Sequence, residues 1–395
     1  MKVTPYKVSP KEINIVNKFK SMDRLKYLIN IEMFVGINRI YLLDCSKTKF
    51  WLTQLSTPII LIITIYQMMY VNVSRVTYLV SKNTFFVELL FLCINGSYFR
   101  KGYLKNCIIK LKEFDMKLNL KHQLILPRTR TIIILAVAIF ITIIIEYIFM
   151  NLKNTNIDSY YSTNVIYLGI LIHKFEMLFY CTLLYSVFLR IRILKQHVEK
   201  KFAIKEQQRI LHRGYKIENI NDKINLDVKN MHLAYELLHS SSEDLNTSLS
   251  FPMTVMLISS GIVNTMLFKF GFNTFDIGEG SKAEAMFCHV LSGFTILQCI
   301  KTALLVVIPC YLSSRTAEQI TDIRRILNDA ILRNEEVSDK LERRKIKAFY
   351  QLARDNDFSY VLWGLIRLDM SLPMSYSGLC VTYLIIVLQF DKFFD

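Results

Sequence analysis

The sequence lacks the motifs by which many enzymes are recognised. It contains no GxSxG nucleophile elbow, no phosphate-binding glycine loop and no HExxH zinc motif. Its eight cysteines form no CxxC pair, so neither a zinc site nor a disulfide framework is indicated. It also shows no inverted repeat of the kind from which many transporters are built. These absences disfavour an enzyme or a transporter, and they indicate no cofactor.

The first 50 residues also lack a secretory signal, because no short apolar core precedes a small-residue cleavage site. What the chain does have is apolar residues gathered into seven long runs, most of them near the roughly 20 residues that a helix needs to cross a bilayer. We therefore expect an all-α, polytopic membrane protein with seven transmembrane helices, whose first span acts as the insertion signal. The runs are Leu52–Val73, Thr84–Phe99, Thr131–Leu152, Val165–Leu189, Leu249–Phe272, Ala285–Leu312 and Leu372–Phe390.

The basic residues are distributed unevenly between the two sides of these runs. A net charge of +16 would suit a nucleic-acid-binding protein, but 41 of the 49 Lys and Arg residues lie before the first run or in alternate connections. Cytosolic loops of membrane proteins collect such residues. We therefore expect a cytosolic N-terminus, an extracellular C-terminus and no nucleic-acid partner. A G-protein-coupled receptor has the opposite orientation, so that class and a transporter are remote alternatives.

Two of the basic connections are long and have the spacing of amphipathic helices, which need a partner face. The first continues the fourth run, and in the second Ile320, Ile323, Leu327, Leu332 and Leu341 alternate with charges. We expect these helices to form a bundle beneath the membrane. The predicted organisation is a cytosolic N-terminal segment (1–50), transmembrane helices one to four (51–189), a cytosolic helical extension (190–248), transmembrane helices five and six (249–312), cytosolic anchor helices (313–369), and a pore helix with a short extracellular C-terminus (370–395).

His232, Glu236 and His239 share one helix face, and their spacing would suit a metal site. No fourth ligand accompanies them, so we favour a polar face of the cytosolic bundle and predict no metal.

The last run carries a narrow polar stripe. Ser375, Thr382 and Gln389 recur every seven residues with Leu379 and Ile386 between them, which places all five on one side of a helix. Such a stripe suits a pore wall that wets and dewets. The alternative is a stripe buried against neighbouring helices.

The same run resembles the C-terminal signature of insect gustatory receptors. Thr382 and Tyr383 are followed by five aliphatic residues and then by Gln389 and Phe390, which matches every position of that signature. The preceding residues Gly364–Asp369 are also similar to the family. The resemblance implies a ligand-gated, non-selective channel for monovalent and divalent cations, assembled as a homotetramer or as a heterotetramer with related subunits. It also implies residence in the plasma membrane of sensory neurons and a cytosolic anchor where subunits meet.

By the same resemblance, Gln389 and Phe390 would form the pore constriction near the outer mouth, and Thr382 and Tyr383 would pack or line the same helix. The sugar-tuned members often carry Glu after the Thr-Tyr pair, where this chain has Leu384. We therefore expect a small-molecule tastant of the bitter or plant-metabolite kind, with a fructose or other sugar receptor as the alternative.

The family binds its ligand in the outer half of the helices of each subunit. Small-molecule sites between helices are lined by aromatic side chains and a few polar groups. Depth and residue type indicate ten candidates: Glu146, Tyr147, Tyr167, His173, Asn264, Phe268, Phe287, His289, Phe294 and Gln298.

Charged residues within spans are functional candidates because burying them in lipid is costly. Lys174 has two interpretations that the sequence leaves open. It pairs with Glu146 if their helices are neighbours, or it pairs with Glu176 or extends to the membrane surface.

Overall fold

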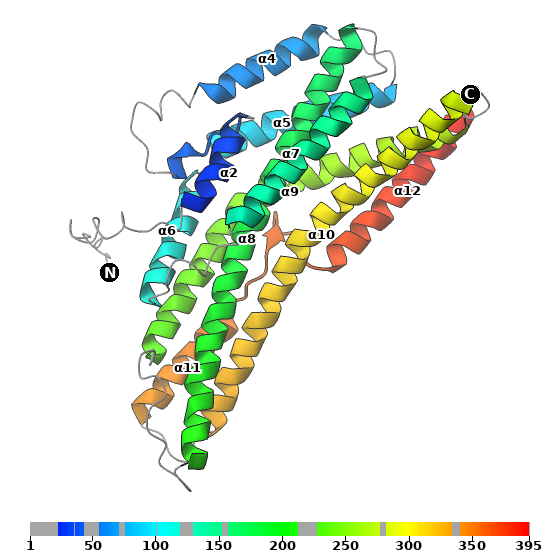
Figure 1. Ribbon diagram of the computed structural model, residues 1–395. Helices are drawn as coiled ribbons and strands as arrows, with labels where there is room; N and C mark the ends of the chain where they lie inside the picture. The colour runs from blue at the N-terminus through cyan, green and yellow to red at the C-terminus, as the bar shows by residue number, and fades with distance from the viewer. Residues whose placement is uncertain are drawn as a thin grey trace.

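The structure is a computed structural model, and it describes residues 23–34, 36–42, 55–70, 76–99, 101–118, 129–151, 157–211, 227–276, 282–333 and 340–394. Figure 1 shows an elongated, almost wholly helical molecule. The helices are α2 (Asp23–Phe34), α4 (Ser56–Tyr70), α5 (Val76–Ser97), α6 (Lys101–Lys117), α7 (Thr129–Asn151), α8 (Ile157–Leu211), α9 (Val228–Asp276), α10 (Lys282–Arg333), α11 (Lys340–Asp355) and α12 (Ser371–Phe394). The 3₁₀ turn η2 (Ile40–Leu42) and the strands β1 (Val361–Leu362) and β2 (Ile366–Arg367) complete the described elements.

The seven apolar runs form the main parts of α4, α5, α7, α8, α9, α10 and α12, which confirms the all-α prediction. Within the described residues, three stretches are both long and apolar enough to cross a membrane, namely Ile166–Phe202, Val228–Met266 and Ser371–Gln389. The first run is represented by a shorter apolar helix, Ser56–Tyr66. Exposed isoleucines along α4 and α7, such as Ile62 and Ile134, give these helices an apolar outer surface, as expected where helices face lipid.

Three helices continue far beyond their apolar runs. α8, α9 and α10 extend downward without a break and form, with α11, the narrow lower part of the molecule (Figure 1). The predicted helical continuation of the fourth run is therefore confirmed. In α10, Ile320, Ile323 and Leu327 are almost completely buried, as their spacing predicted, whereas Leu332 and Leu341 are exposed.

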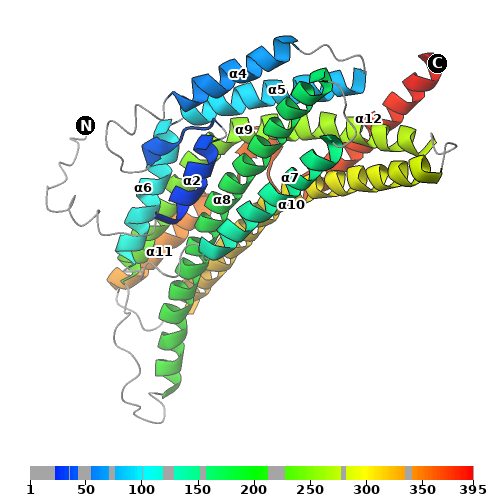
Figure 2. The same cartoon turned by 45° about the horizontal axis from the view of Figure 1, so that its top comes forward.

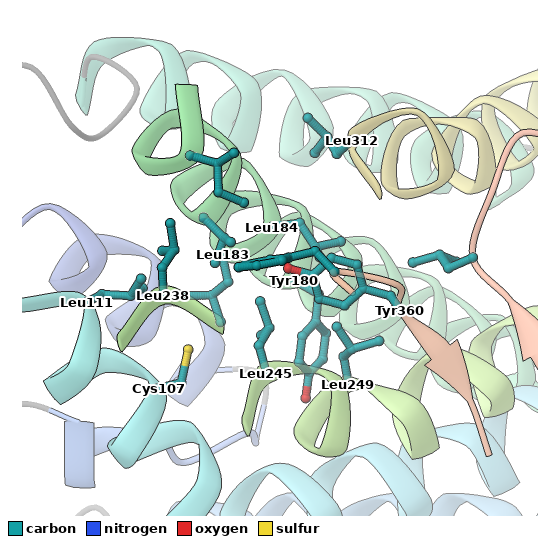
Figure 3. Packing of buried hydrophobic residues seen from close by; sticks show 14 of the residues in the cluster. Cys107, Leu111, Tyr180, Leu183, Leu184, Leu238, Leu245, Leu249, Leu312 and Tyr360 are labelled. Atoms are coloured by element: carbon teal, nitrogen blue, oxygen red, sulfur yellow. The ribbon is translucent and has the colours of Figure 1, made fainter. Parts of the chain in front are cut away.

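One continuous hydrophobic core joins the upper and lower parts. Buried side chains from α6, α8, α9 and α10 meet in it, and Tyr360 from the segment after α11 packs among them (Figure 3). Pro252 and Pro309 lie inside α9 and α10, and Figure 2 shows both helices bending along their length. A proline removes one backbone hydrogen bond of a helix and crowds the preceding turn, so a bend is expected there.

The C-terminal end of α11 is held by side chains from two other helices. Arg324 of α10 donates to the carbonyl oxygens of Ala353 and Asn356 at 2.6 and 3.2 Å, and the Tyr235 hydroxyl of α9 donates to Asn356 O at 3.1 Å. The last carbonyl groups of a helix have no partner within the helix. A cation at this end is also stabilised by the negative end of the helix dipole. α11 is thereby fixed against α9 and α10.

The segment between α11 and α12 is a short hairpin, not the helix that the prediction for residues 313–369 implied. β1 pairs antiparallel with β2, and the turn contains Trp363 and Gly364 at φ values of 51° and 71°. Gly364 fits this left-handed region, but a tryptophan there is strained. Ser250 of α9 compensates by accepting a hydrogen bond from the Trp363 backbone N at 2.8 Å, while Phe251 stacks on the Trp363 ring.

α12 begins directly after this hairpin. Asp369 caps it, because one carboxylate oxygen accepts hydrogen bonds from the backbone N and the hydroxyl of Ser371. The Ser371 hydroxyl is the main reason that the pKa of Asp369 is lowered. Pro373 lies in the first turn, where the missing N–H removes no intrahelical bond.

The described part of the segment before the first span packs against the helix bundle. α2 and the residues after it contact α4, α7 and α8, and Arg39 is fully buried. Arg39 donates to Glu32 at 2.6 Å and forms a second ion pair with Glu176 of α8. The Arg39 guanidinium also lies 4.0 Å from the centre of the Phe179 ring. Part of the N-terminal segment is therefore built into the helix bundle.

Candidate functional site

One face of α12 packs on the chain, and the other is left uncovered. Leu372 and Tyr376 pack against the hydrophobic core, and Cys380 and Leu384 continue this half-buried face by one and two further turns. α12 contacts α9 and α10 and lies on the side of the molecule away from α4 (Figures 1 and 2).

The polar stripe lies on the uncovered face. Its five residues, Ser375, Leu379, Thr382, Ile386 and Gln389, are all exposed. The chain's own described helices therefore do not bury the stripe. Tyr383 is exposed as well, at 54% of its surface, whereas the side chain of Phe390 lies outside the described part of the structure.

Thr382 is the one stripe hydroxyl with a hydrogen bond given by the structure. Its Oγ1 donates to the carbonyl oxygen of Gly378 at 2.9 Å, within the same helix. A threonine that bonds the preceding turn has no free proton to offer, so its presence in an apolar helix is tolerated. Thr382 can therefore face either lipid or water without leaving an unpaired donor.

A row of polar side chains crosses the interior from α5 to α12. This polar row consists of Glu88 on α5, His173 on α8, Ser260 and Asn264 on α9, and Tyr376 on α12. His173 Nδ1 lies 2.5 Å from Glu88 Oε1, and His173 Nε2 lies 3.3 Å from Ser260 Oγ. Asn264 follows Ser260 by one helical turn, and the Tyr376 hydroxyl lies beside both of these side chains.

Three atoms of the polar row are buried without a hydrogen bond of ordinary geometry among the described residues. They are Glu88 Oε2, Asn264 Oδ1 and the Tyr376 hydroxyl oxygen. Glu88 and Asn264 expose only 1% and 4% of their surface. A buried polar atom without a partner costs about 1–3 kcal/mol, so this row is unusual and indicates a functional role or a second conformation.

The predicted ligand residues do not form one cluster in the described part of the structure. His173 and Asn264 belong to the polar row, while the rings of Tyr147 and Tyr167 pack edge to face with centres 5.5 Å apart. Phe268 is half-buried on α9. The side chains of Glu146, Phe287, His289, Phe294 and Gln298 lie outside the described part, and so does any Glu146–Lys174 pair. Glu176, the other partner considered for Lys174, is paired with Arg39.

The charged group around Arg39 has one carboxylate more than it has cations. Burial is the main cause that raises the pKa of Glu32 to about 8, although the charge of Arg39 acts in the opposite direction and the charge of Glu176 adds to the rise. Glu32 Oε1, Arg39 Nε and Glu176 Oε2 are buried and have no hydrogen-bond partner among the described residues. This group fixes the N-terminal segment to α8 through the Arg39–Glu176 ion pair.

His232 and His239 lie against aromatic rings of the lower bundle. The ring centres are 5.9 Å from that of Phe349 and 5.2 Å from that of Phe358, respectively. His239 Nδ1 also lies 3.8 Å from Glu243. Within the described residues, no three His, Cys, Asp or Glu side chains are grouped as metal ligands would be.

Sequence reasoning missed the roles of Arg39, Glu88, Ser260 and Tyr376. Glu88 did carry a signal, because an acidic residue inside an apolar run usually has a function. Arg39 carried none, since it lies among other basic residues before the first run. Ser260 and Tyr376 acquire their place only through the packing of α9 against α12.

A solved structure with the same overall arrangement is the insect olfactory receptor OR5 from Machilis hrabei. It is 13% identical in sequence, with a TM-score of 0.59 over 95% of this chain and 99% of that one. The same receptor in complex with eugenol gives a TM-score of 0.57 at 12% identity, over 94% of this chain and 99% of that one. At such identities the likeness shows a shared fold, with seven transmembrane helices.

A search among curated proteins found no match. The model of the 7tm chemosensory receptor family matches residues 49–394, which is most of the chain. This match includes every helix from α4 to α12, and therefore both the polar row and the uncovered stripe. The chain accordingly belongs to the 7tm chemosensory receptor family.

Proposed function

We propose that this chain is a gustatory receptor that acts as a ligand-gated cation channel, with four copies of α12 around a central pore. The observation that carries this proposal is the division of α12 into a packed face and an uncovered face with regularly spaced polar residues. A lone chain leaves Ser375, Thr382 and Gln389 uncovered, and polar side chains inside a membrane normally face protein or water. Fourfold assembly would place the stripe along an aqueous path.

In this proposal the gate is at the outer end of α12. Phe390 closes the path in the resting state, and Gln389 lines it when the helix has rotated or tilted outward. Ile386 and Leu379 supply apolar rings that dewet a narrow pore. A ligand opens the gate only to the extent that it binds the open state more tightly than the closed one.

The proposed orientation has the N-terminus in the cytosol and the C-terminus outside the cell, in the plasma membrane of sensory neurons. The support is the distribution of Lys and Arg, of which 41 lie on one side of the spans. The narrow lower part of the molecule, formed by α8, α9, α10 and α11, then lies in the cytosol. There it acts as a helical anchor for related or identical subunits. Monovalent and divalent cations are the proposed permeant ions.

For the ligand, we infer a bitter or plant-derived small molecule. The edge-to-face pair of Tyr147 and Tyr167 supplies an aromatic surface at the predicted depth, and the structurally similar OR5 has been solved in complex with eugenol. A fructose or other sugar receptor is the second candidate. The polar row favours it, because His173, Ser260 and Asn264 gather hydrogen-bonding groups that a polyol would use.

The test is whole-cell current from oocytes that express this chain alone, with eugenol, quinine and fructose as probes. We expect an evoked cation current and an increased ligand-free leak in Phe390→Ala. Leu388→Ala is the matched control and should leave the leak unchanged, because Leu388 is half-buried against its own chain. An epitope at the N-terminus should be reached by antibody only after permeabilisation. An extracellular epitope, or no current from either the wild type or Phe390→Ala, would overturn the proposal.

A further inference from the structure

The polar row is the feature that the proposed function leaves unexplained. It lies in the interior, away from the uncovered stripe, and it joins four helices that are distant in sequence. Its contacts are short at the α5 and α8 end, where Glu88 and His173 are paired at 2.5 Å. They are incomplete at the α9 and α12 end, where Asn264 Oδ1 and the Tyr376 hydroxyl are buried and unpaired.

α9 and α12 approach closely at Gly261, where α9 presents no side chain that would block a small displacement of α12. Gly261 lies between Ser260 and Asn264 on the side that α12 approaches, and a Cβ at Gly261 would lie 3.6 Å from the Tyr376 hydroxyl and 4.0 Å from Cys380 Sγ. The two helices are therefore close at this point, without a large side chain of α9 to fix the register. A small displacement of α12 would move the hydroxyl along the row.

The hydrogen-bonding groups of the polar row also indicate the direction in which the Tyr376 hydroxyl would move, namely toward Asn264. A tyrosine hydroxyl has one proton to donate, and Asn264 Oδ1 is an unpaired acceptor beside it. Ser260 already uses its hydroxyl toward His173. A hydrogen bond from Tyr376 to Asn264 is the one that would satisfy two of the three unpaired atoms at once.

We propose that Tyr376 and Asn264 form a gating latch, whose hydrogen bond lacks ordinary geometry in the described arrangement and closes when α12 moves to the conducting one. This inference rests on the proposed channel function and adds the contact that sets its equilibrium. The described arrangement, with two buried atoms unpaired, belongs to the resting state. The hydrogen bond of the latch stabilises the conducting state and thereby offsets the packing contacts that α12 loses when it moves.

Tyr376→Phe tests the latch because it removes only the hydroxyl. The proposal predicts a lower ligand-free current and a higher half-activating probe concentration, by on the order of three- to twentyfold, the range of measured hydrogen bonds between membrane helices. Asn264→Leu should have the same effect, and the double variant should be no worse than either single one. Tyr103→Phe, at an exposed position on α6, removes a hydroxyl far from α12 and should behave as wild type.

The measurements are currents normalised to surface protein, in oocytes exposed to eugenol, quinine and fructose and in ligand-free oocytes, with each variant also placed in the Phe390→Ala background. If neither wild type nor Phe390→Ala conducts, the channel function itself fails and the latch with it. If they conduct and Tyr376→Phe leaves the current unchanged, or if the two single effects add, the latch alone is wrong.

A cross-link provides a second measurement that does not depend on removing a hydrogen bond. Gly261→Cys places a β-carbon 4.0 Å from Cys380 Sγ, so that rotation of the two side chains brings the sulfur atoms to bonding distance. Oxidation should trap the resting arrangement and abolish the current, and a reductant should restore it. The same variant with Cys380→Ser should be insensitive to oxidant. Full current in a chain whose cross-link is confirmed by mass spectrometry would exclude movement at this contact.

Discussion

The helices α8 and α12 have apolar stretches of the same mean hydropathy but opposite surroundings. In Ile166–Phe202 of α8, 67% of the apolar window is buried inside the chain, and in Ser371–Gln389 of α12 none of it is. α8 even buries charge, since Glu176 is paired with Arg39, whereas the α12 stripe is polar but uncharged. Hydropathy alone therefore does not distinguish α8, which is buried in the core, from α12, whose apolar window is exposed.

The largest effect is expected where the buried charge of α8 is disturbed. Arg39→Ala leaves Glu32 and Glu176 buried without their cation, and such a loss costs about 3–5 kcal/mol. We expect most of the folded, surface-exposed protein to be lost, as measured by fluorescence-detected size exclusion and surface biotinylation. Arg325→Ala, at a side chain that is 73% exposed, is the control. Normal levels of Arg39→Ala would mean that the N-terminal segment is not an integral part of the bundle.

A smaller effect is expected from pH. Glu32 keeps its proton in the folded chain up to a pKa of about 8, whereas the ordinary value is 4.5. The folded state binds more protons between these values, so its stability falls as pH rises through this window and levels off above it. We expect the thermal unfolding temperature in detergent to drop by a few degrees between pH 6 and pH 8.5.

Glu32→Gln should reduce that pH dependence, because the amide cannot ionise. Glu318→Gln, at a side chain that is 54% exposed, should retain it. An unchanged slope in Glu32→Gln would assign the titration to another group.

The smallest effect is expected from a matched pair of threonine substitutions, one in α8 and one in α12. Thr182 of α8 and Thr382 of α12 both donate to the carbonyl four residues earlier, at 2.8 and 2.9 Å, but the first is buried and the second exposed. Thr182→Val should lower stability only slightly, because the lost hydrogen bond lies within α8, and should leave conduction unchanged. Thr382→Val should leave stability unchanged and reduce single-channel conductance, because the stripe wets less readily. Equal effects at both positions would contradict the assignment of the stripe to the pore.

The sequence predicted the helices well because apolar runs and amphipathic spacing are local properties. It predicted the long continuation of α8 for the same reason. It did not predict the hairpin at β1 and β2, whose strained Trp363 is compensated by Ser250 and Phe251, more than a hundred residues away in the chain. Nor did it predict the polar row, since the pairing of Glu88 with His173 depends on which helices become neighbours. Among the described ligand candidates, Tyr147 lies against Tyr167, and His173 and Asn264 share the polar row, but the two pairs do not form one cluster.

The hairpin before α12 has a mechanical consequence. Its backbone is tied to α9 through Ser250 and also through Asn246, whose side chain accepts a hydrogen bond from Val361 N at 3.0 Å. The lower end of α12 is thus a fixed point, and the 19 residues from Ser371 to Gln389, separated by 18 rises of 1.5 Å, form an arm of about 27 Å. A tilt of about 6° at the fixed point displaces the far end by about 3 Å, roughly the diameter of a water molecule. In the proposed channel, small contacts near the base of α12 would therefore control the width of the gate at its far end.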